Sequence, residues 1–160
     1  MSDSNPTDRP YVESNVIMTT VRVVAPFVFA YGLFVMFHGA DSPGGGFQGG
    51  VIVGSVVLML AFAFGIDTTR EWVSERALVG LAAGGVLTFA AVGLGALALG
   101  AAFLEYSVYE QFVYDASKYG IELVELAIGG IVAAVVVALF FMLAAGFNAE
   151  GEDEEGGESA

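Results

Sequence analysis

Four long apolar runs, separated by short polar segments, dominate the chain. They cover about residues 16–37, 47–66, 77–104 and 121–147. A helix needs roughly 20 residues to cross a hydrocarbon core of about 30 Å, and each run reaches that length. We therefore predict an all-α integral membrane protein, in which a bundle of four transmembrane helices forms one domain over residues 16–147.

Polar segments flank this domain on both sides. Residues 1–15 have no short apolar core followed by a small-residue cleavage site, so we predict no removable signal peptide and take the first run as a true span. Residues 148–160 are rich in Asp and Glu. Because charge runs of this kind stay solvated, we expect an acidic disordered tail.

Composition supports the membrane class and argues against nucleic-acid binding, metal binding and catalysis. Hydrophobic residues make up 56% of the chain and charged residues only 14%, too few to cover a soluble fold of this size. With five basic residues the chain has no basic face for nucleic acid. It has one histidine and no cysteine, so we predict no metal cluster, no cofactor and no catalytic residue, and hence no enzyme.

The distribution of basic residues predicts the topology. Four spans place both termini on one side, and Lys and Arg near the ends of spans are retained in the cytoplasm. Four arginines lie on the side of the termini, whereas Lys118 is the single basic residue on the other. We therefore predict cytoplasmic termini in a cell membrane. On the outer side we expect an interfacial belt made by the tyrosines at 106, 109, 114 and 119 with Phe112.

A glycine-rich segment joins the first two runs. After His38 the chain reads GADSPGGGFQGG. Pro43 blocks helix continuation, and the glycines permit backbone conformations closed to other residues. Because irregular backbone at membrane depth has to be buried in protein or face water, this loop needs a partner surface. It does not resemble a phosphate-binding loop, since no Gly-Lys-Ser/Thr follows.

Small residues recur every four positions on several predicted helices. The glycines at 46, 50 and 54 form one such stripe, those at 80 and 84 a second, and Gly130, Ala134 and Ala138 a third. In lipid, helices associate through close backbone approach rather than a hydrophobic drive, so these faces are expected to contact other helices. Stripes on this many helices favour contacts with further subunits as well as within the chain.

The few ionisable residues near the apolar runs are the candidates for an ion or proton path, because such residues are costly in lipid. Glu122 and Glu125 lie three apart on one helix face, and Glu125 is the deeper. For both carboxylates a relay and an interfacial role remain open. His38 titrates nearest neutrality but also stands where a helix cap would lie. Arg22 can either pair within a path or extend to the headgroups.

The loop carries a resemblance to a known family. The sequence HGADSPGGGFQGGVI, preceded by VIMTTVRVVAPFVFAYGLFVMF, resembles the hallmark of the MnhB family, which supplies one of the membrane subunits of the Mrp-type multisubunit Na⁺/H⁺ antiporters. The resemblance covers about residues 16–147. Ala40 stands where members commonly have a second histidine, and Glu125 in VELAIGG matches the position of a family Asp. The matching loop and packing positions are Pro43, Gly44, Gly45, Gly46, Phe47, Gln48, Gly49, Gly50 and Gly54.

The resemblance implies a membrane subunit of an antiporter that exchanges Na⁺ and H⁺. It implies partners among other hydrophobic subunits, including large subunits similar to the antiporter-like subunits of respiratory complex I. The close alternative is the corresponding membrane module of a hydrogenase or complex-I-like respiratory complex, and a second alternative is a purely structural subunit. We expect the loop and the small face of the second helix to dock onto adjoining subunits, and Glu125 with His38 and Arg22 to line a hydrated path.

Overall fold

The computed structural model describes residues 14–41 and 44–156, with only the backbone described for residues 146–156. Four long helices form the molecule: α1 (Asn15–Phe37), α2 (Gly46–Phe64), α4 (Glu75–Ala98) and α5 (Ala116–Gly156). Each is long and apolar enough to cross a membrane. Two short helices, α3 (Ile66–Trp72) and the 3₁₀ helix η1 (Tyr106–Gln111), lie in the connections. The predicted all-α membrane class with four spans is confirmed.

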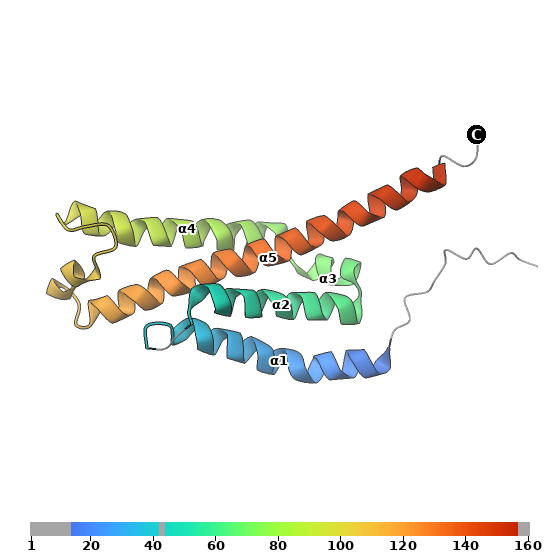
Figure 1. The fold of residues 1–160 in the computed structure, drawn as a ribbon, viewed down its shortest axis with the longest axis horizontal. Helices are drawn as coiled ribbons and strands as arrows, with labels where there is room; N and C mark the ends of the chain where they lie inside the picture. Colours follow the sequence, from blue (N-terminus) through green and yellow to red (C-terminus); the bar gives the residue numbers. More distant parts are fainter. Residues whose placement is uncertain (1–13, 42–43, 157–160) are drawn as a thin grey trace, which may run out of the picture.

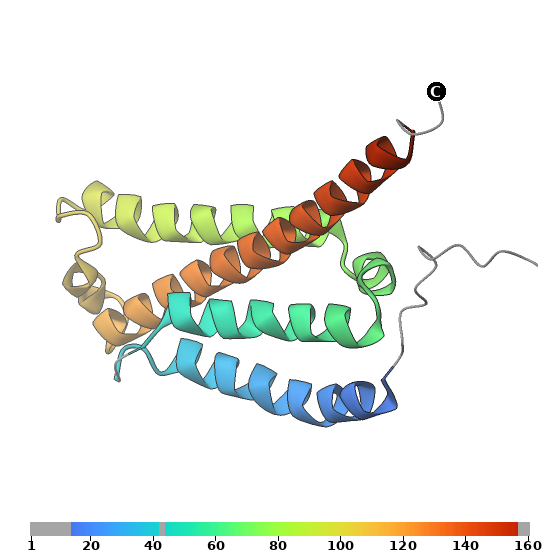
Figure 2. The same ribbon diagram turned by 45° about the vertical axis from the view of Figure 1, so that its right-hand side comes forward.

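The four long helices lie side by side in the order α1, α2, α5, α4 (Figures 1 and 2). The last helix of the chain is thus inserted between the second and the third long helices. Within the described residues α1 and α4 make no contact with each other. The bundle is therefore an open row, in which α1 and α4 form the two edges and α2 and α5 carry most of the buried contacts.

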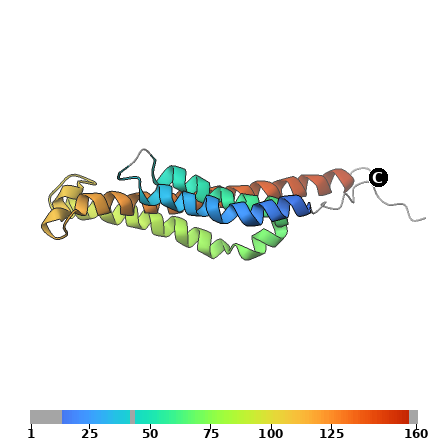
Figure 3. The ribbon, with the colours of Figure 1, turned by 90° about the horizontal axis from the view of Figure 1, so that it is seen from below.

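The two ends of this row carry different features. The start of α1, the helix α3 and the end of α5 lie at one end, as the view from below also shows (Figure 3). The segment between α1 and α2 and the helix η1 lie at the other end. The glycine segment and the tyrosine-rich segment therefore share one end of the molecule. The assignment of the opposite end to the cytoplasm stays a prediction.

Helix α4 ends at Ala98, so the prediction that the third helix continues to residue 104 is wrong. Gly100 has φ +84°, and the amide of Ala101 donates to the carbonyl oxygen of Ala96 at 3.0 Å. A glycine in the left-handed region followed by such a bond is a Schellman ending, which satisfies free carbonyls of the last turn. The apolar sequence continues beyond the helix, which is why hydropathy alone extends it.

The boundaries of α2 and α5 also differ from the predicted ones. Helix α2 ends at Phe64, because Gly65 adopts φ +99° and starts the turn into α3. Helix α5 begins at Ala116 rather than residue 121, with two polar residues in its first turn. It also continues to Gly156, so residues 148–156 of the predicted disordered tail have a helical backbone. Residues 157–160, and residues 1–13 of the N-terminal segment, lie outside the described residues.

Glycines on α2 let two neighbours approach closely. A Cβ atom added to Gly49 would lie 2.8 Å from the carbonyl oxygen of Gly32 on α1. One added to Gly50 would lie 2.5 Å from the carbonyl oxygen of Gly129 on α5, and one added to Gly54 would lie 3.1 Å from Val136. The stripe that includes Gly50 and Gly54 is therefore occupied by α5 of the same chain. The prediction that this face docks onto adjoining subunits is wrong.

The second stripe, on α4, behaves differently. Cβ atoms added to Gly80 and Gly84 would meet nothing within 4 Å, whereas one added to the next residue, Gly85, would lie 2.5 Å from the carbonyl oxygen of Ala127 on α5. The third stripe lies on the matching side of α5, where Gly130 contacts Leu81 of α4. Helix α4 therefore uses one narrow face for α5 and leaves the Gly80–Gly84 face open.

Candidate functional site

The carboxyl group of Glu125 lies beneath the glycine segment that joins α1 and α2. Cβ atoms added to Gly39 or Gly45 would meet this carboxyl group, the latter at 2.5 Å from Oε1. A Cβ atom added to Gly46, the first residue of α2, would meet the backbone carbonyl of Glu125. These three glycines form what we call the glycine cradle. Their lack of side chains leaves the space that the glutamate occupies.

Burial of this carboxyl group is incompletely compensated. The Oε2 atom of Glu125 is buried, and within the described part of the chain it has no hydrogen-bond partner. Buried polar atoms are nearly always hydrogen-bonded, because an unmade bond costs about 1–3 kcal/mol or more. Burial of Oε2 without a partner is therefore a free-energy cost of this site.

The start of α2 supplies the electrostatic surroundings of the site. Gly44 has φ +134°, which only glycine adopts readily, and it turns the chain into α2 at Gly46. The N-terminal end of a helix carries a partial positive charge and unsatisfied N–H groups. The cradle therefore brings the positive end of α2 against α5 at Glu125, where it favours a negative charge that burial disfavours.

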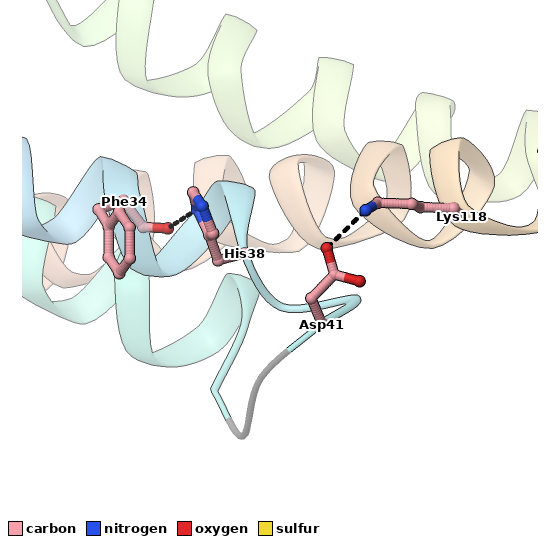
Figure 4. A network of polar contacts seen from close by, with 4 residues as sticks. All are labelled: Phe34, His38, Asp41 and Lys118. Carbon is pink, nitrogen blue, oxygen red and sulfur yellow. Dashed lines mark hydrogen bonds and ion pairs between the residues drawn. The ribbon is translucent and has the colours of Figure 1, made fainter.

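His38 ends α1 close to this segment but is engaged in a local contact. Its Nδ1 donates a hydrogen bond of 3.0 Å to the carbonyl oxygen of Phe34, one helical turn earlier (Figure 4). Its ring also stacks on that of Phe34, with 4.1 Å between the centroids. This geometry fits the helix-cap alternative, because the imidazole satisfies a carbonyl of the last turn.

An ion pair that the sequence did not lead us to expect ties the same segment to α5. The Nζ atom of Lys118 donates to Oδ2 of Asp41 at 2.6 Å, and both side chains are about half exposed (Figure 4). Lys118 and Glu125 are seven residues apart, so they lie on the same face of α5. Residues 39–41 thus contact α5 at the carboxyl group and at the ion pair. The sequence shows that Lys118 and Glu125 share a helix face, but it does not show that Asp41 pairs with Lys118.

The other two predicted path residues lie outside the cradle. Glu122 is partly exposed and lies one turn before Glu125 on α5; its atoms are not among those nearest to the cradle glycines. Arg22 lies toward the start of α1, about 24 Å along the helix from His38 at about 1.5 Å per residue. Its guanidinium carbon is 5.1 Å from the centroid of the Phe64 ring, at the opposite end of the molecule. The structure does not bring Arg22 together with Glu125.

The remaining motif residues divide by position. Pro43 lies outside the described residues, and Phe47 and Gln48 are exposed on the first turn of α2. The buried glycines of the motif contact α1 or α5 as described above. The glycines of this motif therefore pack within the chain, whereas Phe47 and Gln48 point outward.

Tyrosines of the predicted belt separate into two groups. Tyr114 and Tyr119 are exposed together with Phe112, as an interfacial belt requires. Tyr109 instead donates a 2.6 Å hydrogen bond to the carbonyl oxygen of Val92 on α4. Tyr106 packs against Gly120 of α5. Burial, and secondarily the charge of Glu125, raise the pKa of Tyr106 above its ordinary value.

Four membrane-length helices define an α-helical polytopic membrane protein, in which α5 carries a carboxyl oxygen buried beneath the segment between α1 and α2. The family described as a domain related to the MnhB subunit of Na⁺/H⁺ antiporter matches residues 16–141. The chain therefore belongs to the MnhB family.

Relatives from Staphylococcus aureus strains Newman, JH1 and Mu3 carry the name "Putative antiporter subunit mnhB2". Each is 35% identical to this chain over 60 residues, which cover 37% of this chain and 43% of the relative. The matching stretch thus spans less than half the length of these relatives.

Proposed function

We propose that the chain is a membrane subunit of a multisubunit antiporter that exchanges a monovalent cation, Na⁺, for protons across the cell membrane. Glu125 is its ionisable residue on the ion or proton path. The observation that carries the proposal is the buried Oε2 atom beneath the glycine cradle. Membership of a family named for an antiporter subunit supports the choice of reaction.

The free-energy cost of burying the Glu125 carboxyl group favours a role in transport over a purely structural one. A carboxyl group that served only to fix helix packing would gain more from complete hydrogen bonding than from burial with one oxygen unpaired. The three cradle glycines add a second cost, because glycine loses more conformational freedom on folding than any other residue. A site that binds and releases ions or protons requires an ionisable group in this position, which accounts for both the unpaired oxygen and the three glycines.

The open row of helices supports work inside a larger assembly. Helix α4 forms one edge, and only 6% of its membrane-spanning window is buried within the chain. Other hydrophobic subunits, including large antiporter subunits, would cover such edges. His38 and Glu122 stand near the cradle and would tune it, whereas Arg22 serves the opposite interface.

Replacement of Glu125 by Gln tests the role in transport, because glutamine keeps the shape and removes the titration. Cation-dependent proton movement is measured in inverted membrane vesicles, and subunit amounts are measured in the purified complex. We expect normal assembly and a loss of exchange of about tenfold or more, equivalent to about 1.4 kcal/mol. Glu71→Gln is the matched control, since it removes the same charge from an exposed glutamate on α3, at the opposite end of the molecule.

The same measurements test the structural alternative. If Glu125 were purely structural, Glu125→Gln would lower the yield or thermal stability of the complex and leave the exchange rate per assembled complex unchanged.

Copurification through a C-terminal tag at native salt tests the composition of the assembly. Large antiporter-like subunits are expected, and recovery of hydrogenase or other redox subunits in their place would overturn the antiporter assignment.

A further inference from the structure

On the basis of the proposed function, we infer that Glu125 is a site for protons and not for Na⁺. The inference assigns one of the two exchanged ions to one residue. It follows from the space around the carboxyl group and from the chemistry of the groups that surround it.

The glycine cradle leaves little space for a metal ion. Backbone atoms of Gly39 and Gly45 lie so close that a single added carbon at either residue would meet the carboxyl oxygens. Hard cations need several oxygen ligands at about 2.0–2.6 Å, arranged around the ion. A proton needs only a lone pair of the carboxyl group itself. The packed glycine backbone is thus compatible with protonation and unfavourable for coordination.

The end of α2 that faces the site has the wrong polarity for a cation. The start of α2 at Gly46 lies against Glu125, and a helix start presents N–H groups and positive potential. Both repel Na⁺. The same potential stabilises the carboxylate after a proton has left, while burial favours the neutral acid. The cradle therefore accommodates both protonation states, which reversible proton exchange requires.

Titratable groups lie on the helix that carries Glu125 and on two neighbouring segments. Glu122 and Lys118 share its helix, His38 and Asp41 belong to the segment after α1, and Tyr106 comes from η1. Helix α2 carries no titratable residue, and those of α4 lie in its first turn at the far end. Glu122 is thus the carboxylate that acts most directly on Glu125.

Chemical labelling of the intact complex in native membranes tests the inference. N,N′-dicyclohexylcarbodiimide couples to protonated carboxyl groups in apolar surroundings, and mass spectrometry of the modified peptide quantifies the label on Glu125. We expect labelling to fall as the pH is raised, because the reagent couples only to the protonated acid. Replacing choline by Na⁺ at constant ionic strength should leave it unchanged. Glu125→Gln provides the blank.

Two results would overturn the inference. Protection by Na⁺ at fixed pH would show that the cation competes for the carboxyl group, and labelling independent of pH would show that the group does not titrate. Either leaves the antiporter assignment standing. In contrast, pH-dependent labelling combined with unchanged exchange in Glu125→Gln would support the proton site and overturn its part in transport.

Discussion

The backbones of Gly50 and Gly129 lie in direct contact: a Cβ atom added to Gly50 would lie 2.5 Å from the carbonyl oxygen of Gly129. This contact joins α2 to α5, the two central helices of the row. It also positions the cradle, because Gly46 lies one turn before Gly50 and Glu125 one turn before Gly129. Close helix packing and the position of the buried acid are therefore parts of one interface.

Substitution of Gly50 by Leu should unfold or loosen the isolated chain, because the side chain has no space between α2 and α5. Overpacking of this kind costs about 1–3 kcal/mol or more. Thermal unfolding of the detergent-solubilised chain measures the effect. Gly84→Leu is the matched control on the open face of α4, with a change of about 0.5 kcal/mol or less expected. Equal losses in the two variants would contradict the packing.

Substitution of Gly39 by Ala should displace the Glu125 carboxyl group, because the new methyl group would overlap it. We expect a reduced exchange rate per assembled complex. Adding Glu125→Asp withdraws the carboxyl group by one methylene and should restore part of the loss. The comparison of the single and double variants in vesicles measures this coupling, and Gly80→Ala controls for a glycine change in open space. Additive losses would mean that residues 39 and 125 do not share the space.

The ion pair between Asp41 and Lys118 should contribute little to stability but depend on salt. Water and salt both screen the attraction in a pair as exposed as this one. A double-mutant cycle with Asp41→Asn and Lys118→Met, followed by thermal unfolding at low and high salt, gives the coupling energy. We expect coupling at low salt that weakens at high salt. No coupling at low salt would show that the pair does not hold residues 39–41 to α5.

Local sequence properties made much of the fold predictable. Length and hydropathy identify a transmembrane helix without reference to the rest of the chain, and all four spans were found. The end of α4 was missed because apolar residues continue beyond Gly100, so that the backbone conformation of one glycine decides the boundary. The start of α5 was missed because polar residues such as Lys118 form its first turn.

The site was predictable only in part, because tertiary contacts build it. Glu125 was a candidate from its depth in an apolar run. The sequence shows that Gly39 and Gly45 are glycines, but not that a carboxyl group about 80 positions later fills the space beside them. Likewise, the small stripe containing Gly50 was recognised as a packing face, whereas its partner within the chain depends on α5 being inserted beside α2. Arg22 was grouped with the path residues because the sequence does not show how far Arg22 lies from Glu125 in space.

Tyr106 should make the fold sensitive to strongly alkaline pH. Its pKa is raised in the folded state by burial and by the charge of Glu125, so the folded chain retains this proton more strongly than the unfolded chain does. The resulting stability is complete below the unfolded value of about 10 and is lost as pH rises through the folded value. Thermal unfolding in detergent between about pH 8 and pH 11 should show this decline, and Tyr106→Phe should flatten it. The exposed Tyr114→Phe is the matched control; if that variant flattened the decline equally, the buried contact of Tyr106 with α5 would not be its origin.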